Sequence, residues 1–283
     1  MRLLVTGAKG LLGTDLLPVL QNSGYEVIAF GSSELNITDE DSIKYALTHH
    51  KPDVVVNCAA YTAVDKAEEE HKEAQRITDH GAGLLAAATK QIGARLVHFS
   101  TDFVFDGTSN TPYTEEDKTN PIGVYGKTKL DGELKIIASG ARAVIIRTSW
   151  LYGHTGKCFV RSIIDGATKK DELRVVSDQV GSPTYSVDLS VAAAALIENG
   201  YSGIVNFSNE GIASWYDFAT LIVKLARDNG VSVKCKSVTP IKSIEYPLAA
   251  KRPCYSVLDK TLYRKLTGRP VPHWMDALKR YIQ

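Results

Sequence analysis

Two residues with acid–base chemistry lie four positions apart in the stretch VYGKTK at residues 124–129, namely Tyr125 and Lys129. In a helix this spacing places both side chains on one face, about 6 Å apart along the axis. A phenol has an ordinary pKa of about 10, and a nearby ammonium in a partly desolvated site lowers that pKa, which favours proton donation near neutral pH. The pair could protonate a developing alkoxide. Two unrelated surface residues would show the same spacing, so the surrounding sequence must distinguish the two interpretations.

A glycine-rich loop lies near the start of the numbering. The stretch TGAKGLLG at residues 6–13 follows a short apolar run and precedes a helical pattern. In dinucleotide-binding folds such glycines permit a tight turn, let the backbone approach a pyrophosphate and let the helix pack on the strand. The phosphates then lie at a helix N-terminus, where free N–H groups favour anions. Gly7, Gly10 and Gly13 therefore predict dinucleotide binding, with a plain turn as the alternative.

A second polar stretch, FSTDFVFDG at residues 99–107, follows the fourth apolar run. Ligands of parallel sheets bind beyond the carboxyl ends of the strands, so Ser100, Thr101 and Asp102 are expected in the binding crevice. An ordinary capped loop would use the same residue types. Together with Tyr125 and Lys129, this stretch predicts a site that polarises a carbonyl group.

The elements that must position these residues alternate along the chain. Nearly continuous apolar runs at 2–6, 26–30, 53–59, 95–100 and 143–149 are typical of strands buried on both faces, and longer helical patterns separate them. This alternation predicts an α/β fold, a Rossmann-type doubly wound parallel sheet with a smaller C-terminal substrate-binding domain. We expect residues 1–150 to form the NAD(P)-binding domain, 151–283 mainly the substrate-binding domain, and segments near 183–207 to return to the sheet. Later helices are predicted at 159–169, 187–199, 215–229 and 274–282, with strands near 203–207 and 233–238.

Composition excludes several classes of function. The formal net charge is +1 and basic residues form no run, so neither nucleic acid nor a membrane is an expected partner. The four cysteines lie far apart without zinc-site spacing, and no metal site is predicted. No apolar stretch reaches the length of a membrane span and no signal peptide is evident, so a cytoplasmic location is expected.

The order TGxxGxxG, then Ser/Thr, then YxxxK resembles the extended short-chain dehydrogenase/reductase family. Within it, nearly the whole chain resembles the dTDP-4-dehydrorhamnose reductases. The stretches that carry this resemblance are NCAAYTAVDKAEEE (57–70), STDFVFDG (100–107), YGKTKLDGE (125–133), RTSWLYG (147–153), VVSDQVGSPTYSVDL (175–189), SWYDFA (214–219) and KRPCYSVLD (251–259). The resemblance implies reduction of the C4 ketone of dTDP-4-dehydro-L-rhamnose to dTDP-L-rhamnose by NADPH, with NADH also accepted.

The resemblance also implies residue roles. Tyr125 gives its proton to the forming alkoxide, Lys129 lowers the phenol pKa and holds the nicotinamide ribose, and Thr101 hydrogen-bonds the ketone oxygen. The residues expected to bind the cofactor are Gly7, Gly10, Leu11, Leu12, Gly13, Ser32, Asn36, Ile37, Ala59, Ala60, Tyr61, Tyr125 and Lys129. The residues expected to contact the dTDP-sugar are Val64, Thr101, Asp102, Phe103, Trp150 and Arg252, the last because a planar guanidinium suits a diphosphate. An ordinary surface arginine is the alternative for Arg252.

Several positions depart from the family pattern. Phe103 stands where a tyrosine is common, which removes one hydroxyl. Thr78 stands where an asparagine often supports the lysine through water. Asn36 replaces an aspartate beside the adenine, and Leu11 replaces a frequent glutamine in the glycine loop.

The second predicted strand bears on the choice of cofactor. NAD-specific sites usually carry a carboxylate at its end, whereas Gly31, Ser32 and Ser33 follow here and no carboxylate comes before Glu34. No lysine or arginine lies in this stretch, so the sequence predicts only a modest preference for NADPH without a strong cationic clamp.

Four other functions remain open at this stage. A related sugar 4,6-dehydratase usually has Asp-Glu after the threonine, whereas Phe103 follows Asp102 here. An epimerase would retain its nicotinamide cofactor through turnover. A reductase acting on another dTDP-4-keto-6-deoxysugar would carry the same motifs. A regulatory subunit resembling the methionine adenosyltransferase β subunit would share the fold, but the intact Tyr125, Lys129 and Thr101 favour an enzyme. A homodimer is among the assemblies that the resemblance allows.

Overall fold

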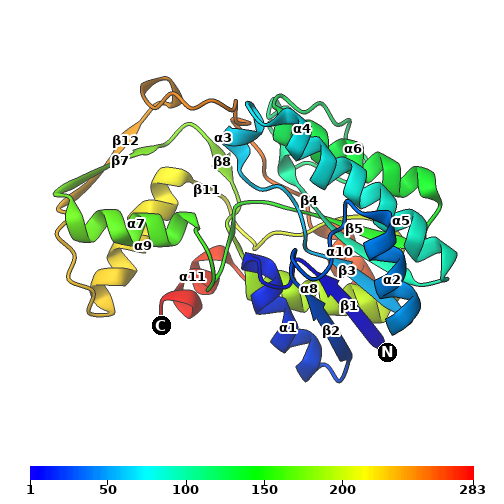
Figure 1. Ribbon diagram of the computed structural model, residues 1–283. Helices are drawn as coiled ribbons and strands as arrows, with labels where there is room; N and C mark the ends of the chain where they lie inside the picture. Colours follow the sequence, from blue (N-terminus) through cyan, green and yellow to red (C-terminus); the bar gives the residue numbers. More distant parts are fainter.

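The computed structural model describes all of residues 1–283 (Figure 1). Its strands are β1 (Arg2–Thr6), β2 (Glu26–Phe30), β3 (Val54–Asn57), β4 (Arg95–Thr101), β5 (Ala143–Thr148), β6 (Leu151–Tyr152), β7 (Glu172–Val176), β8 (Val180–Gly181), β9 (Thr184–Tyr185), β10 (Gly203–Asn206), β11 (Ala213–Ser214) and β12 (Ser237–Ile241). Its α-helices are α1 (Leu11–Asn22), α2 (Glu40–His50), α3 (Val64–Ala67), α4 (His71–Ala74), α5 (Gly81–Gln91), α6 (Val124–Ser139), α7 (Phe159–Lys169), α8 (Ser186–Asn199), α9 (Trp215–Asp228), α10 (Thr261–Thr267) and α11 (Trp274–Ile282). A π-helical turn, η1 (Gln75–His80), and two 3₁₀ turns, η2 (Asp102–Val104) and η3 (Ser243–Glu245), complete the elements.

Six strands form one parallel sheet in the order β10-β5-β4-β3-β1-β2. Strand β1 pairs with β2 on one side and with β3 on the other, so the direction of winding reverses at β1. At such a reversal the loops diverge and leave a crevice beyond the carboxyl ends of the strands, where dinucleotides bind in folds of this kind. The predicted Rossmann-type sheet is confirmed.

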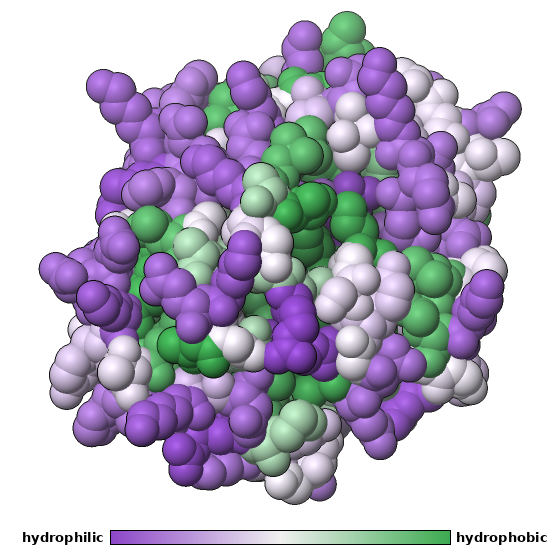
Figure 2. Space-filling model, turned by 90° about the vertical axis from the view of Figure 1, so that its right-hand side faces the viewer, coloured by the Kyte–Doolittle hydropathy of each residue, from purple (hydrophilic) through white to green (hydrophobic).

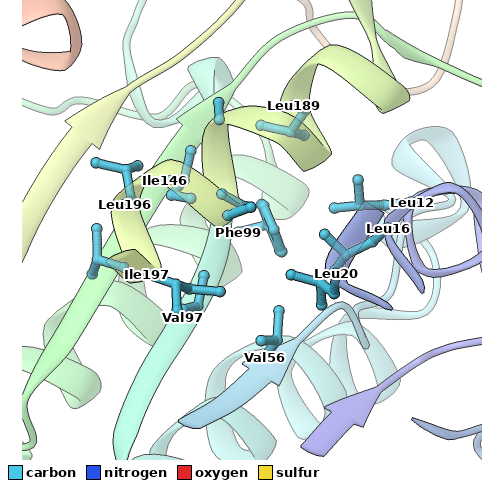
Figure 3. Packing of buried hydrophobic residues seen from close by; sticks show 14 of the residues in the cluster. Leu12, Leu16, Leu20, Val56, Val97, Phe99, Ile146, Leu189, Leu196 and Ile197 are labelled. Atoms are coloured by element: carbon cyan, nitrogen blue, oxygen red, sulfur yellow. The ribbon is translucent and has the colours of Figure 1, made fainter. Parts of the chain in front are cut away.

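Helices α1 and α8 cover one face of this sheet (Figure 3). Leucines spaced along each helix point at apolar side chains of the central strands, because residues three or four apart share one helix face. The residues in contact are Leu12, Leu16 and Leu20 of α1, Leu189, Leu196 and Ile197 of α8, and Val56, Val97, Phe99 and Ile146 of the strands. Segment 186–206, which contributes α8 and β10, therefore packs with the sheet although it follows α7 in the chain.

Helices α2, α5 and α6 cover the opposite face, on the right of Figure 1. Leu47 of α2, Leu85 of α5 and Ile136 of α6 are buried against Val55 and Leu96 of the strands. Because both faces carry helices, the inner strands β1, β3, β4 and β5 have no solvated face, which is why they are apolar without alternation. The site residues on α6 thus belong to a helix that is packed against the sheet and its neighbouring helices.

A smaller lobe, on the left of Figure 1, contains α7, α9, α11 and the parallel pair β7–β12 around its own apolar core. The strand predicted near 233–238 lies instead at Ser237–Ile241. Two backbone N–H groups of the predicted strand, those of Lys234 and Cys235, donate to the carbonyl of Ala167 at the end of α7. These two N–H groups are therefore not available for strand pairing, and pairing with β7 begins only at Ser237.

Figure 2 shows the side of the molecule that lies on the right of Figure 1. Hydrophilic residues occupy most of its outline, and apolar residues gather toward its middle. Among the exposed large apolar side chains of the molecule are Leu134 and Ile137 of α6. None of the helices combines the length and the apolar character that crossing a lipid bilayer requires.

Candidate active site

The glycine loop after β1 has no space for side chains at its glycine positions. Gly7 has a φ of +63°, in the left-handed region that favours glycine, and its carbonyl accepts a 2.9 Å hydrogen bond from the N–H of Gly10. A Cβ added at Gly7 would lie 2.6 Å from the backbone nitrogen of Ala59, and one added at Gly13 would lie 2.5 Å from the Gly7 carbonyl oxygen. All three predicted glycines therefore stand where the backbone turns or packs closely.

Helix α1 begins directly after this loop. Its N-cap is Gly10, which has no side chain to satisfy the first N–H groups, and its first turn contains no acidic residue. These N–H groups are free to bind an anion, so the site fits a dinucleotide pyrophosphate. Leu12 is buried in the core and can offer only its backbone, while Leu11 is half-buried. Ala59 follows β3 and adjoins Gly7, which brings the predicted segment 59–61 to the same loop.

Lys9 supplies the cation that the sequence analysis did not find near the end of β2. The chain pairs Thr6 with Phe30 in register, so the loop after β1 lies beside the residues after β2. The aliphatic part of Lys9 packs against Gly31, and its Nζ lies 3.2 Å from a carboxylate oxygen of Glu34. The stretch after β2 itself contains no lysine or arginine, but this exposed lysine reaches it from the neighbouring loop. Lys9 lies in the loop after β1, and β1 is the neighbour of β2 in the sheet. This position in the sequence could have predicted the contact.

Glu34 lies at the same corner as the predicted residues Ser32, Asn36 and Ile37. The Glu34 carboxylate accepts a 2.7 Å hydrogen bond from the N–H of Gly31. Ser32 and Asn36 are exposed, and the Asn36 side-chain oxygen accepts from the N–H of Thr38. The Ile37 side chain is buried in the core below α2 and α5, so only its backbone could meet a cofactor.

Tyr125 and Thr101 are brought together where α6 meets the end of β4. Gly126 packs so closely against the carbonyl of Phe103 that a Cβ would overlap that oxygen. The Phe103 ring meets the Tyr125 ring edge-on, with centroids 5.6 Å apart and planes at 79°. The Thr101 hydroxyl contacts the phenol, so two of the three predicted catalytic groups share one point above the sheet.

The electrostatics of the phenol differ from the prediction. Burial raises the pKa of Tyr125 to about 12, the contact with Thr101 opposes this rise, and the charge of Asp102 adds to it. The ammonium of Lys129 donates to the backbone carbonyl of Phe99. The phenol pKa is therefore raised and not lowered as expected, because desolvation by burial is the largest effect on it. At neutral pH the phenol keeps its proton and is available as a donor.

Lys129 itself is buried, and burial lowers its pKa to about 8 despite the opposing charges of Glu133 and Cys58. Glu133 lies one helical turn further along α6 and forms a buried ion pair with Arg147 of β5, with Nη2 and Oε2 2.7 Å apart. Ser100 also donates to Glu133. This network ties α6 to β4 and β5 beneath the site. Sequence reasoning missed it because the pair joins two elements.

Asp102 is almost completely buried beside Thr101, whose hydroxyl donates to its Oδ1 at 3.0 Å. Its Oδ2 is buried without a hydrogen-bond partner. Burial raises the pKa of this carboxyl to about 6, with hydrogen bonds opposing the rise. The hydroxyls of Ser256 and Thr101 are the main groups that oppose this rise, so the carboxyl is held by the protein itself.

Trp150 stands two residues beyond Thr148, which pairs in register with Thr101. Its φ of +47° is strained for a bulky residue, and its ring stacks on Trp215 with centroids 3.5 Å apart. The indole also packs against Gly181, where a Cβ would come within 2.7 Å. Trp150 and Trp215 therefore form one flat aromatic surface, although they come from different parts of the chain. Trp215 was not predicted as a site residue.

Val64 begins α3 and is half-buried. The next residue, Asp65, holds Arg252 through two contacts: Nη2–Oδ2 at 2.8 Å and Nη1–Oδ1 at 3.1 Å. Arg252 is therefore neither free nor an ordinary surface arginine, since its planar fork is already matched by a carboxylate. Thr78, buried on η1, accepts a 3.1 Å hydrogen bond from the N–H of Tyr61.

A dinucleotide cradle and a tyrosine–lysine–threonine set on one parallel sheet define a short-chain dehydrogenase/reductase. The family model described as the RmlD substrate binding domain matches residues 1–283. The chain belongs to this family, and the predicted resemblance is confirmed.

The relatives cover the whole chain. The spore coat polysaccharide biosynthesis protein SpsK of Bacillus subtilis (strain 168) is 44% identical over 282 residues, which are 100% of this chain and 97% of that protein. A crystal structure of a dTDP-4-dehydrorhamnose reductase from Clostridium acetobutylicum is 43% identical with a TM-score of 0.93, covering 100% of this chain and 98% of that one. A dTDP-4-dehydrorhamnose reductase of Bacillus anthracis, solved in complex with NADP, is 36% identical with a TM-score of 0.94, covering 99% and 98%.

Proposed function

We propose that this protein reduces the C4 ketone of dTDP-4-dehydro-L-rhamnose to dTDP-L-rhamnose with NADPH. The observation that carries the proposal is the phenol of Tyr125 beside Thr101, at the carboxyl end of a sheet whose glycine loop fits a pyrophosphate. The names of two relatives that match over the full length support the reaction, and the complex of one of them with NADP supports the cofactor.

The cofactor, when bound, supplies the hydride that the ketone carbon accepts. The Thr101 hydroxyl turns from Asp102 to donate to the ketone oxygen, and Tyr125 transfers its proton there as negative charge develops, so the ketone, hydride and proton together give the alcohol. The Tyr125 phenolate that remains is stabilised by the Lys129 ammonium, which is largely charged below its pKa of about 8. Solvent then restores the phenolic proton.

Substrate recognition is divided between the two parts of the chain. Asp102 is expected to contact the sugar beside Thr101, and Trp150 offers a flat apolar surface to the sugar ring. Val64 and Phe103 provide apolar contacts near the deoxygenated edge. Arg252 faces the diphosphate. Residues 1–150 together with segment 183–207 form the cofactor-binding part, and 151–283 mainly the substrate-binding part.

Preference for NADPH follows from Lys9, which lies in the loop after β1 beside the end of β2. Its ammonium can pair with a 2′-phosphate, while the Glu34 carboxylate is occupied by Gly31 and by Lys9 itself. Glu34 is exposed and held only by these contacts. NADH is therefore expected to bind as a second, weaker cofactor.

Steady-state NADPH oxidation with dTDP-4-dehydro-L-rhamnose, with the product identified by NMR, tests the proposal. We expect continuous turnover to dTDP-L-rhamnose. Turnover only with a different dTDP-4-keto-6-deoxysugar would assign the other reductase activity. Absence of turnover with every such sugar, together with tight NADP binding, would instead support a regulatory subunit.

A further inference from the structure

Helix α6, which carries Tyr125 in its first turn, has no N-terminal cap of its own. Its N-cap residue is Gly123, no side chain of the helix caps the first N–H groups, and the first turn has no acidic residue. The cap comes from another element: an oxygen of the Glu68 carboxylate accepts a 2.8 Å hydrogen bond from the N–H of Val124. The residue that receives this bond directly precedes Tyr125.

The glycine at position 123 makes room for this contact. A Cβ added there would lie 2.9 Å from the same Glu68 oxygen, although the backbone at Gly123 is extended and would accept any residue. The absence of a side chain is thus explained by the approaching carboxylate and not by a strained backbone. An alanine at 123 would displace the carboxylate, whose side chain can swing away.

Glu68 is itself anchored. It follows α3 directly, and its backbone carbonyl contacts the imidazole Nε2 of His71 at 2.7 Å. On α3 itself, Asp65 is fastened to Arg252 by the two-point ion pair described above. The carboxylate that caps α6 therefore projects from a segment held at both ends.

We infer that Glu68 is a positioning residue for Tyr125, an inference that rests on the proposed function. The first turn of a helix frays most easily, and Tyr125 is its second residue. With Glu68 in place, the first turn stays wound and the phenol stays beside Thr101. Lys129 lies one turn deeper and is buried with its ammonium on the Phe99 carbonyl, so its position does not depend on the cap.

The variant Glu68→Ala removes the cap. We expect kcat to fall on the order of 10–100-fold, since a displacement of about 1 Å at a reacting group can cost that much. The dissociation constant for NADPH, measured by fluorescence titration, should stay within about twofold of wild type because Lys129 and the glycine loop are untouched. Glu68→Gln keeps an acceptor oxygen and should restore kcat to within about threefold of wild type. Gly123→Ala should lower kcat in the same direction as Glu68→Ala.

A matched control separates positioning from general stability. Asp39 caps α2 by accepting from the N–H groups of Asp41 and Ser42, and Asp39→Ala removes a comparable cap from the same domain. We expect Asp39→Ala to lower the melting temperature about as much as Glu68→Ala but to leave kcat unchanged.

Three results would overturn the inference: wild-type kcat in Glu68→Ala, an equal loss of kcat in Asp39→Ala, or a Glu68→Gln variant as slow as the alanine. If Tyr125→Phe alone retained full turnover, the proposed function would fail instead. Full turnover in Glu68→Ala with an inactive Tyr125→Phe would leave the function standing and remove only the role of Glu68.

Discussion

Asp65 and Arg252 are 187 residues apart in the chain and meet through two parallel contacts, which fasten the C-terminal segment to the short helix that follows β3. Only about a fifth of the Arg252 side chain is exposed. The hydrogen bond from Arg252 lowers the pKa of the Asp65 carboxyl more than the partial burial of this carboxyl raises it. A guanidinium in this two-point geometry is already oriented to receive a phosphate oxygen on its remaining N–H groups.

We expect Arg252→Ala to raise the Michaelis constant for the sugar nucleotide about tenfold, the scale of one charge-assisted hydrogen bond, and to leave that for NADPH unchanged. Arg174→Ala, which breaks an exposed pair with Glu245, is the charge-matched control and should change neither constant. A selective rise in the constant for NADPH would place Arg252 on the cofactor side.

Tyr125→Phe should keep the fold and the affinity for NADPH but reduce turnover by roughly 10²–10⁴-fold, because it removes one positioned proton donor. The measurement is kcat beside the dissociation constant of NADPH. Turnover within twofold of wild type would refute the role of Tyr125. Tyr255→Phe removes a phenol from outside the proposed catalytic set and is a suitable comparison.

Lys9→Ala should lower kcat/KM for NADPH about fivefold while leaving that for NADH within twofold, since one exposed charge-assisted contact contributes roughly 1 kcal/mol. Lys44→Ala removes an equal charge from the surface of α2 and should alter neither value. An equal loss of kcat/KM with both cofactors would show that Lys9 does not bind the 2′-phosphate.

The rate should decline as the pH rises through about 8, because the buried Lys129 loses its proton there and can no longer stabilise the phenolate. The phenol of Tyr125, with its pKa near 12, stays protonated through this range and does not cause the decline. Lys129→Arg keeps a charge at every accessible pH, so a weakly active variant should lose this alkaline limb. An unchanged limb in Lys129→Arg would assign it to another group.

Asp102 should make stability depend on pH. Burial raises its folded-state pKa to about 6, above the unfolded value of about 3.9, so the folded state binds more protons between these values. Stability from this group is therefore greatest below pH 4 and falls as the pH rises through 6, by an upper limit of about 3 kcal/mol. Asp102→Asn should raise the free energy of unfolding relative to wild type more at pH 8 than at pH 4.5, as measured by urea denaturation. An equal difference at both pH values would contradict this assignment.

Sequence alone determined the features that depend on local pattern. The alternation of apolar runs with helical segments predicted the parallel sheet, because strands covered on both faces must be apolar throughout. The glycine loop and the four-residue spacing of Tyr125 and Lys129 predicted a dinucleotide cradle and a catalytic helix, because each is specified within a few adjacent residues.

Tertiary structure alone decided which distant residues act together. Lys9 reaches Gly31 because β1 and β2 are neighbours in the sheet, and Glu68 caps α6 because α3 folds against its first turn. The pKa of Tyr125 moved opposite to expectation, since desolvation sums over every group packed around the phenol whereas the Tyr125–Lys129 spacing describes one pair. Contacts between elements and burial are properties of the whole packed chain, and no short stretch of sequence carries them.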